Sequence, residues 1–415
     1  MSLAAAIAPL YRLRACAVSS VYKYYLFPVL PSTPAPRRRK WANPVLRHMK
    51  RLLFFSLLSS LFFLAAPLVH AQNDLEFEHD GLIREYNLYR PADLRPDAPL
   101  IFVLHGFSSS KEIAQDSLGF DALADRHGFA VCYPQGRRIT LGPRHWNAGL
   151  TLSEVDDVGF LTDLAHHLQS EFNLNPDRTF ACGFSNGGFM CYTLACEAPD
   201  VFRAIASVSG LMSGLTWETC DPARPVPVLQ IHGLDDDFVP VDGSMAYPGG
   251  WGGAPRLDSI VSFWALLNNA TLPELKLESA FAAATYFRNP LGGNEVWYFL
   301  ISDLGHSWPT IDRTGIDAAD VVWDFFDRYD PPSTSVLTSV DGPDLRVFPN
   351  PTASVVNIEL NHPGLLEFRL TSLLGAPLLQ GNLAADRTLL NLADLPHGVY
   401  FLHIGNTVRK ILKTD

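Results

Sequence analysis

Short apolar runs alternate with longer amphipathic stretches along the chain from residue 82 to residue 329. The runs predict strands at residues 82–91, 99–106, 130–136, 178–182, 202–210, 226–233, 276–288 and 295–302. The amphipathic stretches predict helices near residues 111–127, 155–172, 187–198, 257–268 and 316–329. Strands that alternate with helices form a mostly parallel sheet with helices on both faces. We therefore expect an α/β domain over residues 75–330.

The pattern changes after this domain. Residues 331–345 are rich in Pro, Ser, Thr and Asp and have no apolar period, which predicts a linker. Three short alternating strands follow, separated by Pro, Gly and Asn, at residues 355–360, 365–370 and 398–404. Such strands are typical of a small β-sandwich, which we expect over residues 346–415.

The first 71 residues differ from both parts. They contain ten of the 32 Lys and Arg residues and no Asp or Glu. Read from Met49, they show a basic start, the apolar run 52–66 and a series of small residues, as a secretory signal peptide does. A membrane anchor is the alternative because the run approaches spanning length, but the proline and small residues after it favour a cleavage site. We predict a signal peptide over residues 49–71, no stable transmembrane anchor, and a non-native or disordered leader over residues 1–48.

The chain after residue 71 is acidic, because 22 basic residues face 43 acidic ones, a net charge of −21. Its summed field repels phosphate, so charge gives it no affinity for nucleic acid. A neutral or insoluble substrate fits better. With 47% apolar and 18% charged residues, the composition is that of a globular protein and excludes a disordered or coiled-coil chain.

Five cysteines follow the predicted signal, and none has the C-x-x-C spacing of a metal site. Disulfides form in an exported protein, although a domain of this size has enough core without them. Cys196 falls on a predicted helix and Cys220 in a nearby loop. We therefore predict a disulfide between these two.

The segment Gly183-Phe184-Ser185-Asn186-Gly187 matches the pattern G-x-S-x-G. It follows a predicted strand and opens a predicted helix, which is the setting in which a serine is lifted on a strained turn above a sheet. The alternative is an ordinary helix N-cap serine in a glycine-rich turn. We select Ser185 as the candidate nucleophile.

A serine hydroxyl needs an imidazole to remove its proton and a carboxylate to fix the tautomer of that imidazole. After Ser185, the strand 226–233 leads into three adjacent acids, Asp235, Asp236 and Asp237. Like charges so close raise one another's pKa, so we expect hydrogen bonds to hold one acid in the site, while the others face water or cap the next turn. We choose Asp236, with Asp235 as the second choice.

The base must follow the acid in the chain if the order is serine, acid, histidine. His306 is the one histidine after Asp236 within the α/β domain, since the later ones fall in the predicted sandwich. His306 is therefore the candidate base. His105 and His232 precede glycines at strand ends, and we interpret them as hydrogen-bonding residues that fasten loops.

The negative charge that develops on the carbonyl oxygen of an ester during the reaction also needs hydrogen-bond donors. The backbone amide of Asn186 opens the helix after the nucleophile, and the backbone amide of Phe107 lies in the loop after the strand 99–106. We predict that these two amides form an oxyanion hole.

These motifs resemble those of the secreted polyhydroxybutyrate depolymerase-like and feruloyl esterase-like α/β-hydrolases over about residues 75–330. The shared segments, in order, are LHGFSSS, YPQG, WNAG, VDDVGFL, GFSNGG, IHGLDDDFVP and GHSWP. In that family the acid is the fifth residue from the His of the His-Gly pair, which is Asp236 here, and the base is the His of GHSWP, which is His306. The extra acids around Asp236 depart from the family pattern.

The tail resembles the C-terminal sorting domain of type IX secretion, through VFPNPTASVVNIEL, LADLPHGVYFLHI and VRKILK. The resemblance implies a secreted protein, extracellular or attached to the cell surface, and the type IX machinery as a partner. A carbohydrate-binding sandwich is the alternative, but it would present more exposed aromatic residues.

Together these features predict a secreted serine esterase that acts through an acyl-enzyme and needs no cofactor and no metal. Asp156 and Asp157 are expected to be hydrogen bonders at a helix start. Trp146, Trp251 and Trp308 are predicted to line the substrate cleft. The substrate is either a polyester or an acylated plant polysaccharide. A catalytically inactive binding protein and a serine peptidase are the rival hypotheses.

Overall fold

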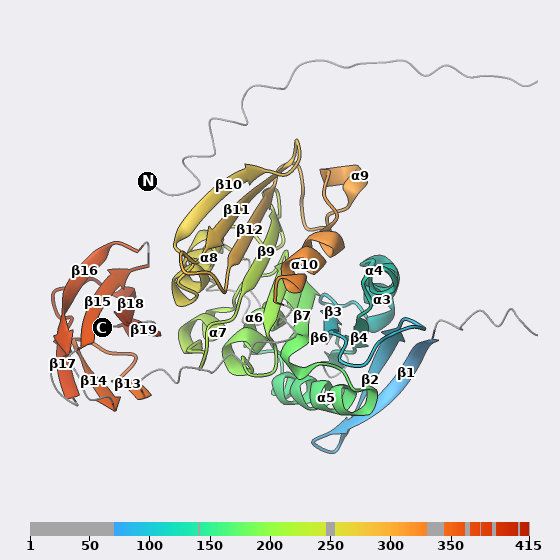
Figure 1. Ribbon diagram of the computed structural model, residues 1–415, viewed down its shortest axis with the longest axis horizontal. Coiled ribbons are helices and arrows are strands. Elements are labelled where there is room, and N and C mark those ends of the chain that lie inside the picture. Colours follow the sequence, from blue (N-terminus) through green and yellow to red (C-terminus); the bar gives the residue numbers. More distant parts are fainter. Residues whose placement is uncertain are drawn as a thin grey trace, which may run out of the picture. The chain divides into compact units, whose positions relative to one another are not determined.

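The computed structural model describes residues 70–139, 142–245, 254–329, 344–361, 366–373, 375–383, 387–405 and 407–414. A ten-stranded sheet organises the first three of these ranges (Figure 1). Its strands, in spatial order, are β1 (His70–His79), β2 (Leu82–Arg90), β4 (Ala130–Pro134), β3 (Leu100–Leu104), β7 (Thr179–Phe184), β8 (Ala204–Val208), β9 (Val228–Gly233), β12 (Val296–Ile301), β11 (Ala282–Arg288) and β10 (Leu272–Leu277).

The middle of this sheet is parallel and its two edges are antiparallel. Each neighbouring pair from β4 to β12 runs parallel, whereas β1 and β2 on one side and β11 and β10 on the other run antiparallel. Because strands at the centre of the sheet are covered on both faces, their sequences are unbroken runs of apolar residues. The predicted α/β fold with a mostly parallel sheet is confirmed.

Strand β3 shows how the two faces are filled. Leu100, Phe102 and Leu104 belong to one apolar cluster, and Ile101 and Val103 belong to the other. Successive side chains of a strand point to opposite faces, so one five-residue run contributes to both halves of the core. All five residues are buried.

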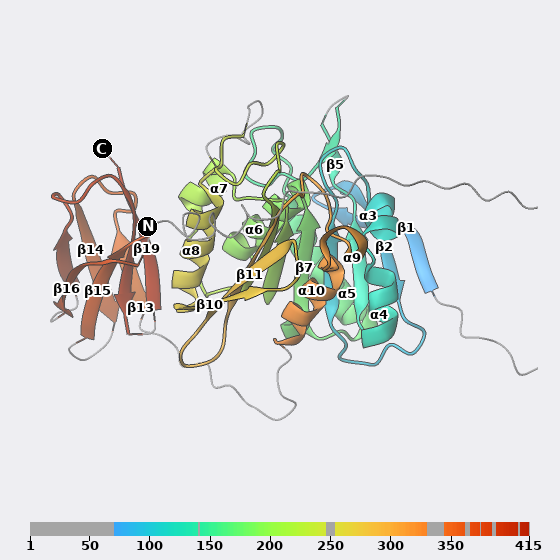
Figure 2. The ribbon, with the colours of Figure 1, turned by 90° about the horizontal axis from the view of Figure 1, so that it is seen from above.

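Helices cover both faces of the sheet (Figure 2). On one face, residues of α5 (Asp157–Phe172), α6 (Asn186–Glu197) and α8 (Leu257–Leu267) join the first cluster. On the other, residues of α3 (Lys111–Ser117), α4 (Phe120–His127) and α10 (Ala318–Asp327) join the second. The short helices η3 (Pro176–Arg178), α7 (Gly214–Thr219) and α9 (Ile311–Thr314) lie in the connections.

Several elements differ from the prediction. The single helix expected near residues 111–127 is two helices, because Gly119 between them has a φ of 83° that ends the first one. The segment expected as one strand over residues 276–288 is a hairpin of β10 and β11. Strand β1 was not predicted at all, since its residues are largely polar.

The predicted leader, most of the predicted signal peptide and most of the predicted linker lie outside the described residues. Strand β1 begins at His70, two positions inside the range predicted for the signal. Strand β13 (Asp344–Phe348) likewise begins within the range predicted for the linker. Among the described helices, none has the length and apolar character that a membrane crossing requires.

The C-terminal part forms two small antiparallel sheets, with strand orders β13-β14-β17 and β16-β15-β18-β19. Besides β13 their strands are β14 (Val355–Asn361), β15 (Leu366–Ser372), β16 (Pro377–Leu383), β17 (Arg387–Asn391), β18 (Gly398–Ile404) and β19 (Thr407–Lys413). Both sheets contribute to one apolar cluster, with Ile358 from the first and Leu402 from the second. The predicted sandwich is confirmed, with seven strands where three were expected.

Cys196 and Cys220 form a disulfide, as predicted. It joins the end of α6 to the residue after α7, 24 positions apart. The other described cysteines, Cys132, Cys182 and Cys191, are buried thiols.

We predict that the double variant Cys196→Ala/Cys220→Ala loses about 2–4 kcal/mol of unfolding free energy, because the crosslink restricts the unfolded chain. Denaturant unfolding measures the loss. Cys191→Ala is the matched control, since it removes a buried thiol without opening a crosslink. If reductant lowered the melting temperature of the double variant as much as that of the wild type, the prediction would be wrong.

Candidate active site

Three candidate residues follow three strands of the parallel region. Ser185 comes directly after β7, Asp236 follows β9, and His306 follows β12. These strands lie close together, in the order β7, β8, β9, β12. Because the carboxyl ends of parallel strands meet at one edge of a sheet, all three residues are placed at the same edge.

Ser185 occupies a strained turn between β7 and α6. Its φ of 54° and ψ of −119° are unusual for a residue with a side chain. The Ser185 amide donates to the Val208 carbonyl at 2.8 Å, and the Ser185 carbonyl accepts the Phe189 amide at 3.0 Å. A Cβ at Gly187 would overlap the Leu104 carbonyl, so only glycine allows helix α6 to approach β3 this closely.

The three adjacent acids are separated by burial. Asp236 is 4% exposed, whereas Asp235 and Asp237 are exposed. The Oδ1 atom of Asp236 accepts the backbone amides of Phe238 at 3.0 Å and Val239 at 2.8 Å. These bonds fix the carboxylate and leave Oδ2 directed toward the loop after β12.

His306 meets that carboxylate, with 2.8 Å between its Nδ1 and Oδ2 of Asp236. Burial alone would raise the pKa of Asp236, but hydrogen bonds from His232 and His306 and from the Val239 amide outweigh it and hold the pKa well below its usual range. Asp236 is therefore a charged acceptor that orients the imidazole of His306. This is the arrangement that a general base requires.

His232 has a structural role, because both of its ring nitrogens have hydrogen-bond partners. Its Nδ1 lies 3.0 Å from the amide nitrogen of Gln230, which can only donate, so Nδ1 accepts and Nε2 carries the proton. Nε2 lies 2.7 Å from the Val239 carbonyl and 3.4 Å from Oδ2 of Asp236. The ring is buried and fastens the acid's loop, as expected of a loop-fastening residue.

Two aromatic rings lie close to His306. Phe184, the residue before Ser185, lies 5.0 Å from it between ring centroids, and Phe238 lies at 5.5 Å. Phe238 is 76% exposed, which is unusual for a phenylalanine. Sequence reasoning missed Phe238, although it directly follows the three acids.

The predicted oxyanion loop follows β3. Asn186 is the first residue of α6, where backbone amides have no acceptor within the helix. Its side chain accepts the Trp146 amide at 2.7 Å and donates to the Trp146 carbonyl at 3.1 Å. Phe107 is 39% exposed, and the next amide, that of Ser108, donates to the Arg144 carbonyl at 2.9 Å.

His105 anchors this loop from inside. The backbone amide of Gly136 donates to its Nε2 at 3.0 Å, so Nδ1 carries the proton and donates to the Gly106 carbonyl at 2.7 Å. Burial lowers the pKa of His105 to about 4, which keeps this ring neutral. His105 therefore fastens a loop, as the sequence indicated.

The three tryptophans predicted to line the cleft differ in burial and in whether the structure describes them. Trp146 is fully buried and donates from Nε1 to the His105 carbonyl at 3.0 Å, so it supports the loop after β3 and does not line a cleft. Trp251 lies outside the described residues. Trp308 is half-buried and packs edge-on against Phe184 at 6.4 Å between centroids.

Asp156 and Asp157 are hydrogen bonders at a helix start, as predicted. Asp156 caps α5 by accepting the Gly159 amide at 2.7 Å. Asp157 is buried and accepts from Arg84 at 2.6 Å and from the Asn147 amide at 2.7 Å. The second acid therefore fixes the loop next to Trp146.

Two family profiles match the chain. The one described as "Esterase PHB depolymerase" matches residues 84–230, and the one described as "Secretion system C-terminal sorting domain" matches residues 346–414. The first contains Ser185 and the loop with Phe107. The second covers the C-terminal sandwich.

Curated relatives carry esterase names. "Feruloyl esterase C" of Emericella nidulans is 30% identical over 254 residues, which cover 59% of this chain and 83% of that protein. "Bifunctional acetylxylan esterase/xylanase XynS20E" of Neocallimastix patriciarum is 29% identical over 167 residues, which cover 40% of this chain but only 23% of that protein. Among solved structures, "Acetyl xylan esterase from Aspergillus awamori" matches with a TM-score of 0.47 and 13% identity, covering 63% of this chain and 99% of that one.

We predict that stability falls as the pH drops from about 6.5 to 4, partly through His105. The unfolded chain protonates this histidine near pH 6.5, but the folded chain protonates it only near pH 4. Between these values the unfolded state binds more protons, so its free energy falls relative to the folded state. The contribution is about 3 kcal/mol over this window.

Denaturant unfolding at pH 7, 5.5 and 4 measures this dependence. The variant His105→Gln should lose stability less steeply over the same range. An equal fall in the wild type and the variant would contradict the assignment to His105.

Proposed function

The chain belongs to the PHB depolymerase family of esterases and is a carboxylic ester hydrolase, and we propose that it works through a Ser185-His306-Asp236 triad and an acyl-enzyme. The observation that carries this proposal is the 2.8 Å contact between Asp236 and His306, whose ring lies against the residue before Ser185. The strained backbone of Ser185 supports it, since such strain gathers at functional residues.

In this mechanism Ser185 attacks the ester carbonyl while Nε2 of His306 takes the serine proton. Asp236 accepts from Nδ1, which holds that tautomer and stabilises the imidazolium that forms. His306 then gives the proton to the leaving alcohol. Water activated by the same histidine attacks the acyl-enzyme, releases the acid and restores Ser185.

The negative charge that develops on the carbonyl oxygen is met, in this proposal, by the backbone amides of Asn186 and Phe107. The buried contacts of Asn186 with Trp146 and of Trp146 with the His105 carbonyl support it, because they tie the two donor segments together. Donors fixed before reaction stabilise an oxyanion without reorganising.

The substrate class that the site favours is an aromatic acyl ester on plant polysaccharide, such as a feruloyl ester. Phe238 and Phe107 are exposed, and the Phe238 ring lies 5.5 Å from the imidazole of His306, tilted by 39° against it. Exposed rings at this place give an aromatic acyl group apolar surface to cover. The name of the relative "Feruloyl esterase C" agrees with an aromatic acyl ester. The name of the acetylxylan esterase agrees only with an ester on plant polysaccharide. A hydroxybutyrate polyester is the alternative substrate.

The C-terminal sorting domain indicates secretion or attachment to the cell surface. We propose that the type IX machinery is the partner that exports the chain. An exported enzyme reaches insoluble substrate that cannot enter the cell, which agrees with the substrate class above.

We predict that Asp236→Asn lowers kcat for p-nitrophenyl acetate by roughly 10³–10⁴-fold, because the imidazole loses its charged acceptor. Ser185→Ala should lower kcat by about 10³-fold or more. Asp235→Asn and Asp237→Asn are matched controls, since each removes the same charge from an exposed neighbour, and both should stay within about threefold of the wild type.

Steady-state kinetics on the purified variants decide the matter. Equal rates for the wild type and Ser185→Ala would end the serine mechanism and favour an inactive binding protein. Hydrolysis of peptides but not of esters would favour a peptidase.

We predict that Phe238→Ala lowers kcat/KM for methyl ferulate by about 5- to 10-fold, because an aromatic pair contributes about 1 kcal/mol. Activity on p-nitrophenyl acetate should change less than threefold. Phe348→Ala, an exposed ring of the C-terminal sandwich, is the control. Faster cleavage of hydroxybutyrate oligomers than of methyl ferulate by the wild type would overturn the aromatic ester in favour of the polyester.

A further inference from the structure

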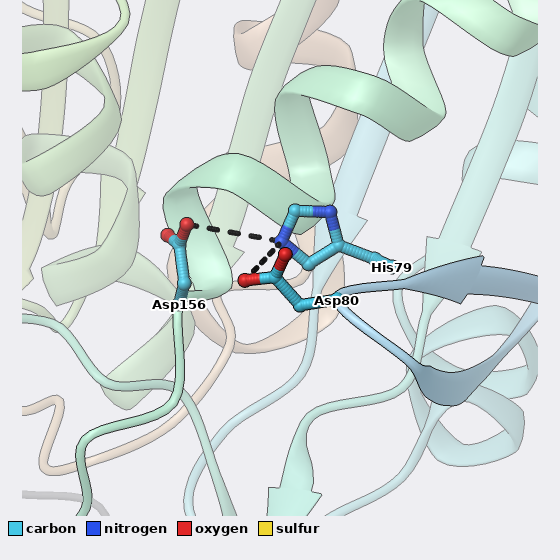
Figure 3. A group of neighbouring side chains, drawn as sticks. All are labelled: His79, Asp80 and Asp156. Atoms are coloured by element: carbon cyan, nitrogen blue, oxygen red, sulfur yellow. Dashed lines mark ion pairs between the residues drawn. The ribbon is translucent and has the colours of Figure 1, made fainter.

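His79, Asp80 and Asp156 converge where the β1–β2 hairpin meets the start of α5 (Figure 3). Nε2 of His79 lies 3.7 Å from Oδ2 of Asp156 and 4.0 Å from Oδ2 of Asp80. One ligand atom from each of the three residues fits within 4.8 Å of the other two. None of these residues has a part in the ester chemistry described above.

Local structure builds this cluster from two directions. Asp80 and Gly81 form the two-residue turn between β1 and β2, with φ values of 49° and 68°, the left-handed pair that a tight hairpin needs. Asp156 caps α5 through Oδ1, which leaves Oδ2 for the cluster. A side chain on Gly159 would collide with the Asp156 carboxylate and crowd the His79 ring.

His79 has one ring nitrogen engaged and one without a hydrogen-bond partner. Its Nδ1 lies 2.9 Å from Oδ2 of Asp163. Its side chain is only 10% exposed, and its buried Nε2 has no hydrogen-bond partner. Figure 3 shows this Nε2 directed at the carboxylates of Asp80 and Asp156. This buried nitrogen points at two carboxylates but forms no hydrogen bond with either. Such an arrangement indicates a ligand between the nitrogen and the carboxylates.

The distances fit a small cation. Tetrahedral zinc, with bonds of about 2.0–2.2 Å to nitrogen or carboxylate oxygen, holds its ligand atoms about 3.3–3.6 Å apart. The separations of 3.7 Å and 4.0 Å from His79 are slightly longer, so small shifts of the two carboxylates bring them into this range. The two carboxylates are 76% and 56% exposed, so they are free to close the remaining distance between them.

The charges also favour a cation. Asp80, Asp156 and Asp163 carry three negative charges around a single imidazole. A protonated ring leaves two of them uncompensated, whereas a divalent ion with a neutral ring leaves one. The contact of Nδ1 with Asp163 matches the carboxylate–histidine–metal arrangement, in which an outer carboxylate orients the ligating ring.

We propose that His79, Asp80 and Asp156 bind one divalent transition-metal ion, best represented by Zn²⁺. The imidazole ligand selects zinc-like ions over Ca²⁺ and Mg²⁺, which prefer oxygen ligands. The ion joins the hairpin to the first turn of α5. Arg84 of β2 already binds the adjacent Asp157, so the ion adds a second link between the hairpin and the start of α5.

Isothermal titration of Zn²⁺ into the full-length, tag-free chain, stripped with chelator, tests the site. We expect one Zn²⁺ per chain for the wild type, and at least a tenfold weaker affinity for His79→Gln and for Asp156→Asn. Asparagine still accepts the Gly159 amide, so the helix cap is retained in the second variant. A hundredfold excess of Zn²⁺ over the dissociation constant should raise the melting temperature of the wild type by about 5 °C or more.

His167→Gln is the matched control, because it removes a histidine of α5 that also faces a carboxylate, Glu171 at 2.8 Å. It should bind Zn²⁺ as the wild type does, and so should Ser185→Ala, which separates this site from the ester chemistry. Circular dichroism of each stripped variant verifies that it is folded. Equal Zn²⁺ affinity in the wild type and His79→Gln, no binding at 100 μM Zn²⁺, or stabilisation by Ca²⁺ alone would each refute the proposal.

Discussion

The positive φ of Ser185 is the constraint on which the candidate active-site edge depends. A residue held in such a conformation costs about 1–3 kcal/mol and persists only where its surroundings fix it. Here every residue of α6 except Glu197 is buried. The packing therefore fixes the position of this helix against the sheet. Gly183 and Gly187 let the helix approach, because a side chain at either would overlap backbone atoms. The strain is thus maintained by the packing of a whole helix.

Burial divides the histidines of this edge into two kinds. His105 and His232 are fully enclosed, each has one nitrogen that accepts and one that donates, and each fastens a loop to a neighbouring strand end. His306 is partly exposed and has a charged carboxylate on Nδ1. An enclosed neutral ring holds geometry, whereas an accessible ring next to a carboxylate can exchange a proton. These two roles could be predicted from the sequence. His105 and His232 each precede a glycine at a strand end, whereas His306 is the histidine that follows Asp236 within the α/β domain.

The centre of the fold was predictable and its edges were not. Strands buried on both faces are unbroken apolar runs, and Ser185, Asp236 and His306 lie in the segments that follow three of them. The edge strands β1 and β10 carry polar or exposed residues, and β10 contains Pro273, so their pairing depends on neighbours that local pattern does not reveal. Burial selects Asp236 among three acids, and it removes Trp146 from the cleft. Phe238 was missed because its importance comes from His306, almost 70 positions later.

His79 and His306 begin from the same arrangement, a carboxylate oxygen at 2.9 Å or 2.8 Å from Nδ1, and differ in what Nε2 meets. An acceptor on Nδ1 leaves the lone pair on Nε2 and increases its basicity. In the proposed mechanism, the lone pair on Nε2 of His306 takes the proton of Ser185. Facing two carboxylates, the lone pair on Nε2 of His79 suits a cation, because a proton there would leave more negative charge uncompensated. In these two proposals the same oriented imidazole supports general-base chemistry at one place and metal binding at another, and the residues opposite Nε2 determine which of the two it supports.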